Sequence, residues 1–272
     1  DALTGTALRT PWVSPGADGA LRRAPFGDEE RDQGRGWCEF CYTMAGNARL
    51  SSLRELLERA VVEGVPGDFV EAGVWRGGAS IFARAVQRVA GQGAERRVYA
   101  CDSFRGVPQA STSLDTDWFH GMHFLEVPLE QVRDHFERFR MLDANVVFVK
   151  GYFLHSLPLL RDRLRQEGRQ IAVLRGDGDL FESYYDILYN LYDLVPVGGY
   201  VVCDDCPNVV MAHAAVHQFR ARHGITEAMV PIRGSAAGMY WRKARRAAVD
   251  YGYYLRWNAT RRRPGAGAGG GL

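Results

Sequence analysis

The sequence predicts an α/β protein built on a doubly wound, mostly parallel sheet of seven strands. Strand and helix patterns alternate from residue 50 to residue 223, which is typical of a parallel sheet with helices on both faces. Acidic residues stand at the ends of four of the predicted strands. Two further strand patterns, at 228–232 and 239–242, follow without a helix between them and are expected to close the sheet as an antiparallel hairpin.

Hydrophobic periodicity defines the elements in order. Residues 50–62 have the helical stripe Leu53, Leu56, Leu57 and Ala60. Residues 68–71 form a short strand that runs into a glycine-rich turn and a helix at 79–89, which makes the first βα unit. The same reasoning predicts strands at 97–101, 145–149, 171–175 and 200–203, and helices at 127–139, 156–165, 184–194 and 213–223.

We expect one catalytic domain at 43–258 with an irregular segment at each end. Residues 1–42 are rich in Gly, Pro, Arg and Asp and predict an extended arm or lid that cannot form a core alone. Residues 259–272 have low complexity and predict a disordered tail. The three consecutive arginines from Arg261 are interpreted as solvated charge.

The composition excludes several classes of protein. With 34 Lys and Arg against 32 Asp and Glu, the net charge of +2 gives no field for nucleic acid binding. No apolar run is long enough to span a bilayer and no signal peptide is evident, so a cytoplasmic protein that does not bind membranes is expected. Five cysteines predict reduced, buried thiols. The alternative is a four-thiolate zinc site made by Cys38, Cys41, Cys203 and Cys206.

A glycine-rich turn and an acid after the next strand predict a nucleoside site. Gly73, Gly77 and Gly78 allow the backbone to approach a ligand, although such glycines also serve helix packing. Asp102 ends the second strand, where a carboxylate can accept hydrogen bonds from ribose hydroxyls. The spacing is not G-x-G-x-x-G, which favours S-adenosylmethionine over a dinucleotide.

Three carboxylates at adjacent strand ends predict a divalent cation site. Asp177, Asp204 and Asp205 would repel one another unless a cation such as Mg²⁺ lay between them. Metal coordination would lower the pKa of a substrate hydroxyl. Asp177 and Asp179 are the candidate catalytic residues, Asp179 as proton acceptor or as holder of the water shell of the metal, and Asp177 as metal ligand and alternative base. The alternatives are exposed loop acids and, for Asp179, a helix cap.

Together these segments resemble the macrocin O-methyltransferase family, enzymes that methylate hydroxyls of deoxysugars and related groups in antibiotic biosynthesis. The resemblance runs from about Thr43 to Lys243 and rests on six motifs in order. They are Thr43-Met44-Ala45-Gly46, Gly64 to Asp68, Val70 to Gly78, Asp102 to Gly106, Gly151-Tyr152-Phe153 with Ser156-Leu157-Pro158, and Leu174 to Asp179 followed by Asp204-Asp205.

The resemblance implies a Rossmann-like class I methyltransferase fold, S-adenosylmethionine as cofactor, Mg²⁺ at the three aspartates, a glycosylated natural product as acceptor, and a homo-oligomer. The implied cofactor-binding residues are Thr43, Met44, Glu71, Gly73, Ser80, Asp102, Ser103, Gly151, Phe153 and Asp177. By the same analogy, the arm and residues 112–126 form a lid over the acceptor, with Trp118, His120 and His123 as candidate substrate-binding residues.

The chain departs from the family pattern at Gly176, His155 and Cys206, which leaves the acceptor undetermined. Two alternative functions are compatible with the fold class. A catalytically idle protein that binds S-adenosylmethionine as a partner or regulator is disfavoured by retention of the three carboxylates. A nicotinamide-dependent oxidoreductase is disfavoured by the lack of the dinucleotide motif.

Overall fold

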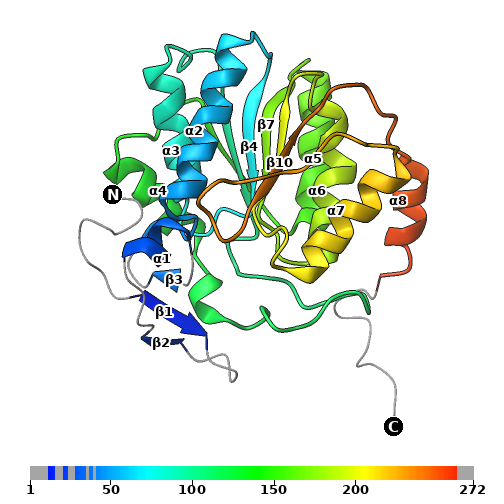
Figure 1. Cartoon of the computed structure of the whole chain (residues 1–272), viewed down its shortest axis with the longest axis horizontal. Helices are drawn as coiled ribbons and strands as arrows, with labels where there is room; N and C mark the ends of the chain where they lie inside the picture. Colours follow the sequence, from blue (N-terminus) through cyan, green and yellow to red (C-terminus); the bar gives the residue numbers. More distant parts are fainter. Residues whose placement is uncertain (1–11, 16–20, 24–27, 35–36, 39–40, 262–272) are drawn as a thin grey trace.

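The computed structural model describes residues 12–15, 21–23, 28–34, 37–38 and 41–261. The predicted arm contributes a small antiparallel sheet of order β2-β1-β3 and a short helix, and the rest of the arm lies outside the described residues. These elements are β1 (Trp12–Pro15), β2 (Leu21–Arg23), α1 (Asp28–Asp32) and β3 (Trp37–Cys38). They lie at the lower edge of Figure 1, near the ends of the central strands.

The central sheet confirms the predicted fold class. Its strand order is β6-β5-β4-β7-β8-β10-β9, with β6 to β8 parallel and the last two strands antiparallel. The direction of winding reverses between β4 and β7, the place where ligands bind in open α/β sheets. The strands are β4 (Asp68–Ala72), β5 (Val98–Asp102), β6 (Val146–Lys150), β7 (Ile171–Gly176), β8 (Tyr200–Cys203), β9 (Val230–Pro231) and β10 (Met239–Arg242).

Alternating strand residues bury two separate cores. Phe69 and Val173 join the core beneath the leucine stripe of α2, whereas Val70 and Leu174 face the opposite core under α5, α6 and α7. Strands β4 and β7 are buried on both faces and are therefore mostly apolar, with Asp68, Glu71 and Arg175 as their buried charged residues. The helices are α2 (Gly46–Val62), α3 (Gly78–Val89), α4 (Leu129–Arg138), α5 (Phe153–Gln166), α6 (Phe181–Leu191) and α7 (Val210–Arg222).

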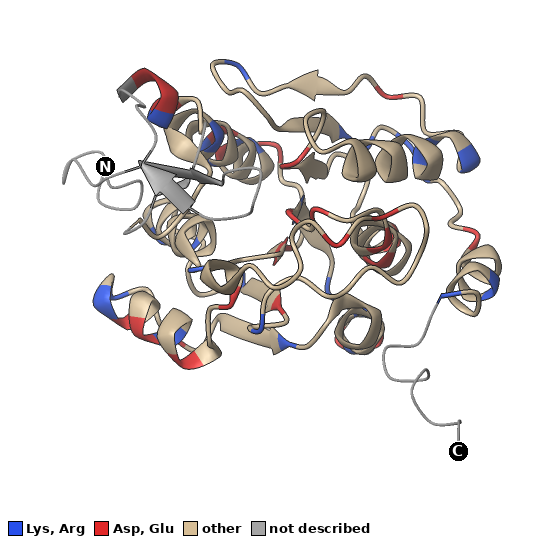
Figure 2. Ribbon diagram, turned by 90° about the horizontal axis from the view of Figure 1, so that it is seen from below, with Lys and Arg blue, Asp and Glu red and all other residues tan. Residues whose placement is uncertain are grey.

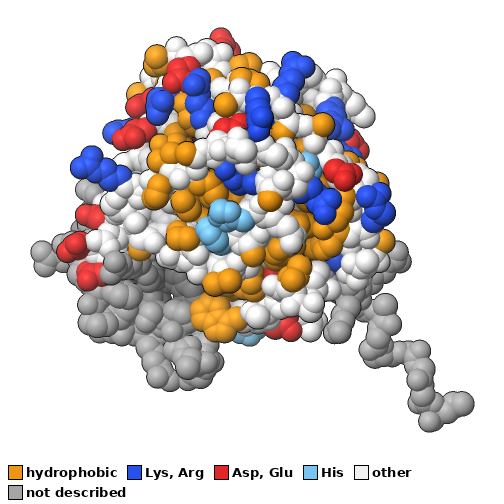
Figure 3. Space-filling view, turned by 45° about the vertical axis from the view of Figure 1, so that its right-hand side comes forward, with side chains coloured by type: hydrophobic (Ala, Val, Ile, Leu, Met, Phe, Trp, Pro, Cys, Tyr) orange, Lys and Arg blue, Asp and Glu red, His pale blue; other side chains and the backbone are white. Residues whose placement is uncertain are grey.

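The C-terminal segment contains a helix that the sequence pattern did not predict. Helix α8 (Tyr251–Asn258) begins at Asp250, whose side chain accepts a hydrogen bond from the Tyr253 amide at 2.9 Å. The expectation that Arg261 is solvated is wrong, because its side chain is only 7% exposed and pairs with Glu182 and Asp186. On the face shown in Figure 3, basic, acidic and hydrophobic side chains are interspersed.

The cysteines correct a second expectation. Cys203 and Cys206 form a disulfide, Cys41 is also disulfide-bonded, and Cys101 is the free cysteine of the described residues. The prediction of reduced thiols is therefore wrong for these three residues. The disulfide also removes the two thiolates on which the four-cysteine zinc alternative depends.

Within the described chain, no helix is long and apolar enough to cross a membrane.

Candidate active site

A cavity of about 960 Å³ opens at the carboxyl ends of β4, β5 and β7. Acidic positions gather near this end of the sheet when the ribbon is seen from below (Figure 2). Eight predicted site residues border the cavity: Met44, Gly73, Asp102, Ser103, His120, Phe153, Asp177 and Asp179. The predicted residues that do not border it are Thr43, Glu71, Ser80, Gly151, Trp118, His123, Asp204 and Asp205.

Gly73 makes the close approach that brings the β4 and β7 ends together. Its φ is +93°, and a Cβ built there would lie 1.7 Å from the carbonyl oxygen of Asp177. No residue with a side chain fits this position without moving the Asp177 turn. Gly73 thus allows the backbones at two strand ends to pack closely, and the same contact places Asp177 at the cavity wall.

Asp102 organises the turn that follows β4. Its Oδ2 accepts a hydrogen bond from the Val74 amide at 2.8 Å, and Oδ1 accepts one from the Phe104 amide at 2.8 Å. Burial raises the pKa of Asp102 while these backbone hydrogen bonds lower it. The carboxylate thus joins the two loops that line this side of the cavity.

Arg175 joins three carboxylates beneath the cavity. Its guanidinium lies 2.5 Å from Glu71, 3.0 Å from Asp177 and 2.6 Å from Asp204, and its side chain is 5% exposed. Glu71 also accepts a hydrogen bond from the buried Ser80 hydroxyl. Both residues therefore support the site from below. The expectation that only a metal ion could offset the clustered aspartates is wrong, since arginine does so in part.

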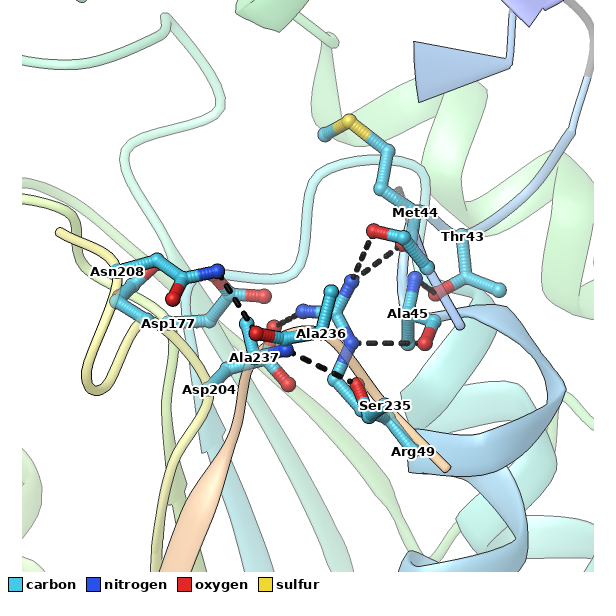
Figure 4. A network of polar contacts seen from close by, with 12 residues as sticks. Thr43, Met44, Ala45, Arg49, Asp177, Asp204, Asn208, Ser235, Ala236 and Ala237 are labelled. Atoms are coloured by element: carbon cyan, nitrogen blue, oxygen red, sulfur yellow. Dashed lines mark hydrogen bonds and ion pairs between the residues drawn. The ribbon is translucent and has the colours of Figure 1, made fainter. Parts of the chain in front are cut away.

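A second arginine reaches Asp204 from helix α2 (Figure 4). Arg49 donates to the Asp204 carboxylate and to the carbonyl oxygens of Met44 at 2.6 Å and Ala45 at 2.7 Å. It also contacts the Gly34 carbonyl at 3.3 Å. Arg49 therefore connects the end of β8 to the cavity-lining Met44 and to the last part of the arm. Thr43 stabilises the same turn, because its hydroxyl accepts a hydrogen bond from the Ala45 amide at 3.1 Å.

Asp205 holds the turn that carries Asp177 and Asp179. Its Oδ2 accepts hydrogen bonds from the amides of Gly178 and Asp179, both at 3.1 Å, and from the Tyr184 hydroxyl at 2.7 Å. Asp179 has a left-handed backbone with φ of +59°, a conformation that this turn imposes.

The carboxylates raise one another's pKa. Burial first, and then the charge of Asp204, raises the pKa of Asp177 well above its ordinary value, against the opposing effect of Arg175. Burial and the charge of Asp205 raise the pKa of Asp179 well above normal. The guanidiniums of Arg175 and Arg49 do not balance all of the carboxylates, so this end of the sheet keeps a surplus of negative charge. One-third of the Asp177 side chain is exposed.

Comparison with known proteins identifies the family. Residues 12–243 match the model of the macrocin O-methyltransferase (TylF) family. The chain belongs to the macrocin O-methyltransferase family. Membership makes it an S-adenosylmethionine-dependent O-methyltransferase, and the sheet topology agrees with that class of enzyme.

Relatives of this O-methyltransferase act in antibiotic biosynthesis. An 8-demethyl-8-(2,3-dimethoxy-alpha-L-rhamnosyl)-tetracenomycin-C 4'-O-methyltransferase of Streptomyces olivaceus is 44% identical over 77% of this chain and 78% of its own. A demethyldecarbamoylnovobiocin O-methyltransferase of Streptomyces niveus is 38% identical over 82% and 84%. The structure of the O-methyltransferase NovP superposes with a TM-score of 0.77 at 36% identity, covering 90% of this chain and 96% of that one.

The O-methyltransferase covers one side of its cavity with the segment after β5. His120 borders the cavity and lies 3.1 Å from the Val107 carbonyl. Trp118 instead packs edge-on against Phe119, and His123 is exposed beside Glu126. The structure therefore brings one of the three candidate substrate residues to the cavity.

Sequence reasoning missed the arginines of the site. Arg175 lies within the motif Leu174 to Asp179. Because a charged residue inside a buried strand needs a partner, its position was a usable signal. Arg49 gave no such signal, because its helix position is compatible with solvent. Glu182, Asp186 and Arg261 also border the cavity and were not predicted.

Proposed function

We propose that this enzyme transfers a methyl group from S-adenosylmethionine to a sugar hydroxyl of a glycosylated natural product, with a divalent cation at the site. The main support is that one cavity is bordered by two pairs of residues. Gly73 and Asp102, called the donor-side residues because they are expected to bind S-adenosylmethionine, border it together with Asp177 and Asp179. Its volume of about 960 Å³ is at the upper end for ligand sites, which suits two ligands side by side.

The reaction needs alignment and a proton acceptor. The acceptor oxygen forms a bond to the methyl carbon as the carbon–sulfur bond breaks, and S-adenosylhomocysteine leaves. The hydroxyl proton passes to Asp179, whose carboxylate borders the same cavity. Asp205 and Gly73 hold the turn so that this carboxylate stays at the cavity wall.

The donor set fits a hard cation such as Mg²⁺. Asp177, Asp204 and Asp205 offer carboxylate oxygens, and the buried Asp204 Oδ1 accepts no aligned hydrogen bond although Arg175 lies 2.6 Å away. As their side chains stand, the described residues contain no group of three side chains that could hold a metal ion, and Asp204 is paired with Arg49. We therefore propose that these three aspartates hold the ion and that Arg49 gives up Asp204 to it. When bound, the cation would lower the pKa of the acceptor hydroxyl.

The charge around the cavity favours an uncharged acceptor. Five carboxylates border it, from Asp102, Asp177, Asp179, Glu182 and Asp186. Of its described lining residues, Arg261 alone is a Lys or Arg, and that guanidinium is already paired. A ligand with a diphosphate would meet repulsion here, whereas a neutral glycoside would not.

Binding and turnover test the proposal separately. Calorimetry with S-adenosylmethionine and with NAD should give binding only to the former. Turnover is then screened with demethyldecarbamoylnovobiocin and rhamnosyl tetracenomycins, with and without chelator. Binding without methyl transfer to any glycoside would favour an idle partner protein instead.

The metal is tested with Asp204→Ala and, as matched control, the exposed Asp162→Ala. The former should lose Mg²⁺-dependent turnover and retain cofactor binding, and the latter should keep both. Full activity of Asp204→Ala in chelator would refute the metal assignment. Location in the cytoplasm and assembly into a homo-oligomer stay predictions.

A further inference from the structure

Helix α8 is a fixed part of the fold that lies beyond the family match. Tyr254 is 1% exposed and stacks on Tyr189 of α6 at 5.1 Å, and Trp257 packs on Tyr185 at 4.6 Å. The Tyr254 hydroxyl donates to Asp186 at 2.7 Å. Aromatic pairs of this kind fix relative position as well as burying area. Residues just after α8 are therefore held at one place against α6.

Arg261 uses that position to join three separate segments. Its guanidinium lies 2.8 Å from Asp186 and 3.1 Å from Glu182, both on α6. Its Nε donates at 2.9 Å to the Ser111 hydroxyl, and Ser111 directly precedes residues 112–126, the segment predicted to form a lid. Ser111 in turn donates through its hydroxyl and its amide to Glu182. Every group in this cluster is buried, so its hydrogen bonds are strong and costly to break.

The cluster lines the same cavity as the donor-side residues. Ser111, Glu182, Asp186 and Arg261 all border it. The donor-side residues Gly73 and Asp102 stand at the ends of β4 and β5. Glu182 and Asp186 come instead from α6, which follows β7, and Arg261 comes from the segment after α8, so only Ser111 comes from the loop after β5. In Figure 1, α8 lies at the edge of the molecule remote from α2 and α3.

We propose that Arg261 is a positioning residue that determines affinity for the acceptor. It holds Ser111 against α6 and fixes the carboxylates of Glu182 and Asp186, whose oxygens accept hydrogen bonds from acceptor hydroxyls. This inference rests on the proposed function for the identity of the acceptor. The link between Arg261 and the lid does not depend on turnover.

The test compares Arg261→Ala and Arg261→Lys with Arg256→Ala, which replaces an exposed arginine of helix α8. Hydrogen exchange of the peptide covering residues 107–120 should speed up in Arg261→Ala and stay unchanged in Arg256→Ala. With the acceptor found in the glycoside screen, the KM for acceptor should rise about tenfold in Arg261→Ala, the size expected for losing a charge-assisted hydrogen bond. The KM for S-adenosylmethionine should stay unchanged, and Arg261→Lys should recover part of the loss.

Ser111→Ala serves as the second variant if Arg261→Ala fails to fold, because it leaves the buried ion pairs intact. It should loosen the same peptide and raise the same KM. Exchange rates and acceptor KM that match Arg256→Ala would overturn the proposal, as would an equal loss of cofactor affinity. If the wild type methylates no glycoside, the proposed function fails while the exchange result still decides the role of Arg261 in holding the lid.

Discussion

Glu71 and Arg175 are direct partners in the parallel pair of β4 and β7, and the Arg175 guanidinium lies 2.5 Å from the Glu71 carboxylate. The pair is buried in the switch region of the sheet. Arg175 extends the contact to Asp177 and Asp204. One guanidinium therefore determines how three strand ends meet beneath the cavity.

Removal of this guanidinium should destabilise the protein strongly. Arg175→Met leaves Glu71 and Asp204 buried with less compensating charge, so we expect a loss of about 3–5 kcal/mol in the free energy of unfolding. The control is Arg97→Met, which breaks the more exposed pair with Glu167 and should cost about 1 kcal/mol or less. Urea denaturation measures both, and equal losses would contradict the role given to Arg175.

Gly73→Ala should disturb the Asp177 turn. The added Cβ would overlap the Asp177 carbonyl, whereas Gly91 has a similar φ of +72° with no atom within 4 Å of a Cβ. Gly91→Ala should therefore cost only the left-handed backbone penalty of about 1–2 kcal/mol. Gly73→Ala should cost more and should also weaken turnover. Thermal denaturation that ranks the two variants equally would argue against the close approach.

Asp115 caps helix α6 from the lid. Its carboxylate accepts hydrogen bonds from the amides of Phe181 at 2.6 Å and Glu182 at 3.1 Å. Asp115→Ala should lower the free energy of unfolding by about 1–2 kcal/mol, because two helix N-terminal donors lose their acceptor. The nearby Asp117, which accepts only an exposed loop amide in the described residues, provides the control. No difference between the two variants in denaturation would disprove the cap.

Asp186 should give the protein a pH-dependent contribution to stability. Burial raises its pKa to about 6, against the lowering effect of Arg261. The folded state thus holds the proton more tightly than the unfolded chain, where an Asp titrates near about 3.9. This contribution is fully present below about pH 4 and is lost as the pH rises through about 6.

Urea denaturation of the wild type and Asp186→Asn at two pH values measures this contribution. The free energy of unfolding of the wild type minus that of Asp186→Asn should be larger at about pH 5 than at about pH 7.5. A difference that is the same at both pH values would show that Asp186 does not titrate in this range.

Much of the fold could be predicted because local pattern and burial agree. The stripe of leucines in α2 and the apolar runs of β4 and β7 each meet a core on the expected face. Helix α8 could not be predicted in this way, because its short run buries chiefly the one tyrosine that meets α6. Two thiols expected to be free also form a disulfide, since their spacing alone did not decide their chemistry.

The sequence by itself determined which residues follow the strands at the site. In chain order they are a glycine turn, Asp102, Asp177 with Asp179, and Asp204 with Asp205. Backbone periodicity places such residues at strand ends whatever their neighbours are. Only the tertiary structure decided which arginines pair with the acidic residues around the cavity. Arg49 lies 155 residues from Asp204 and Arg261 lies 75 from Asp186, and such pairs depend on helix orientation and register, which no local pattern encodes.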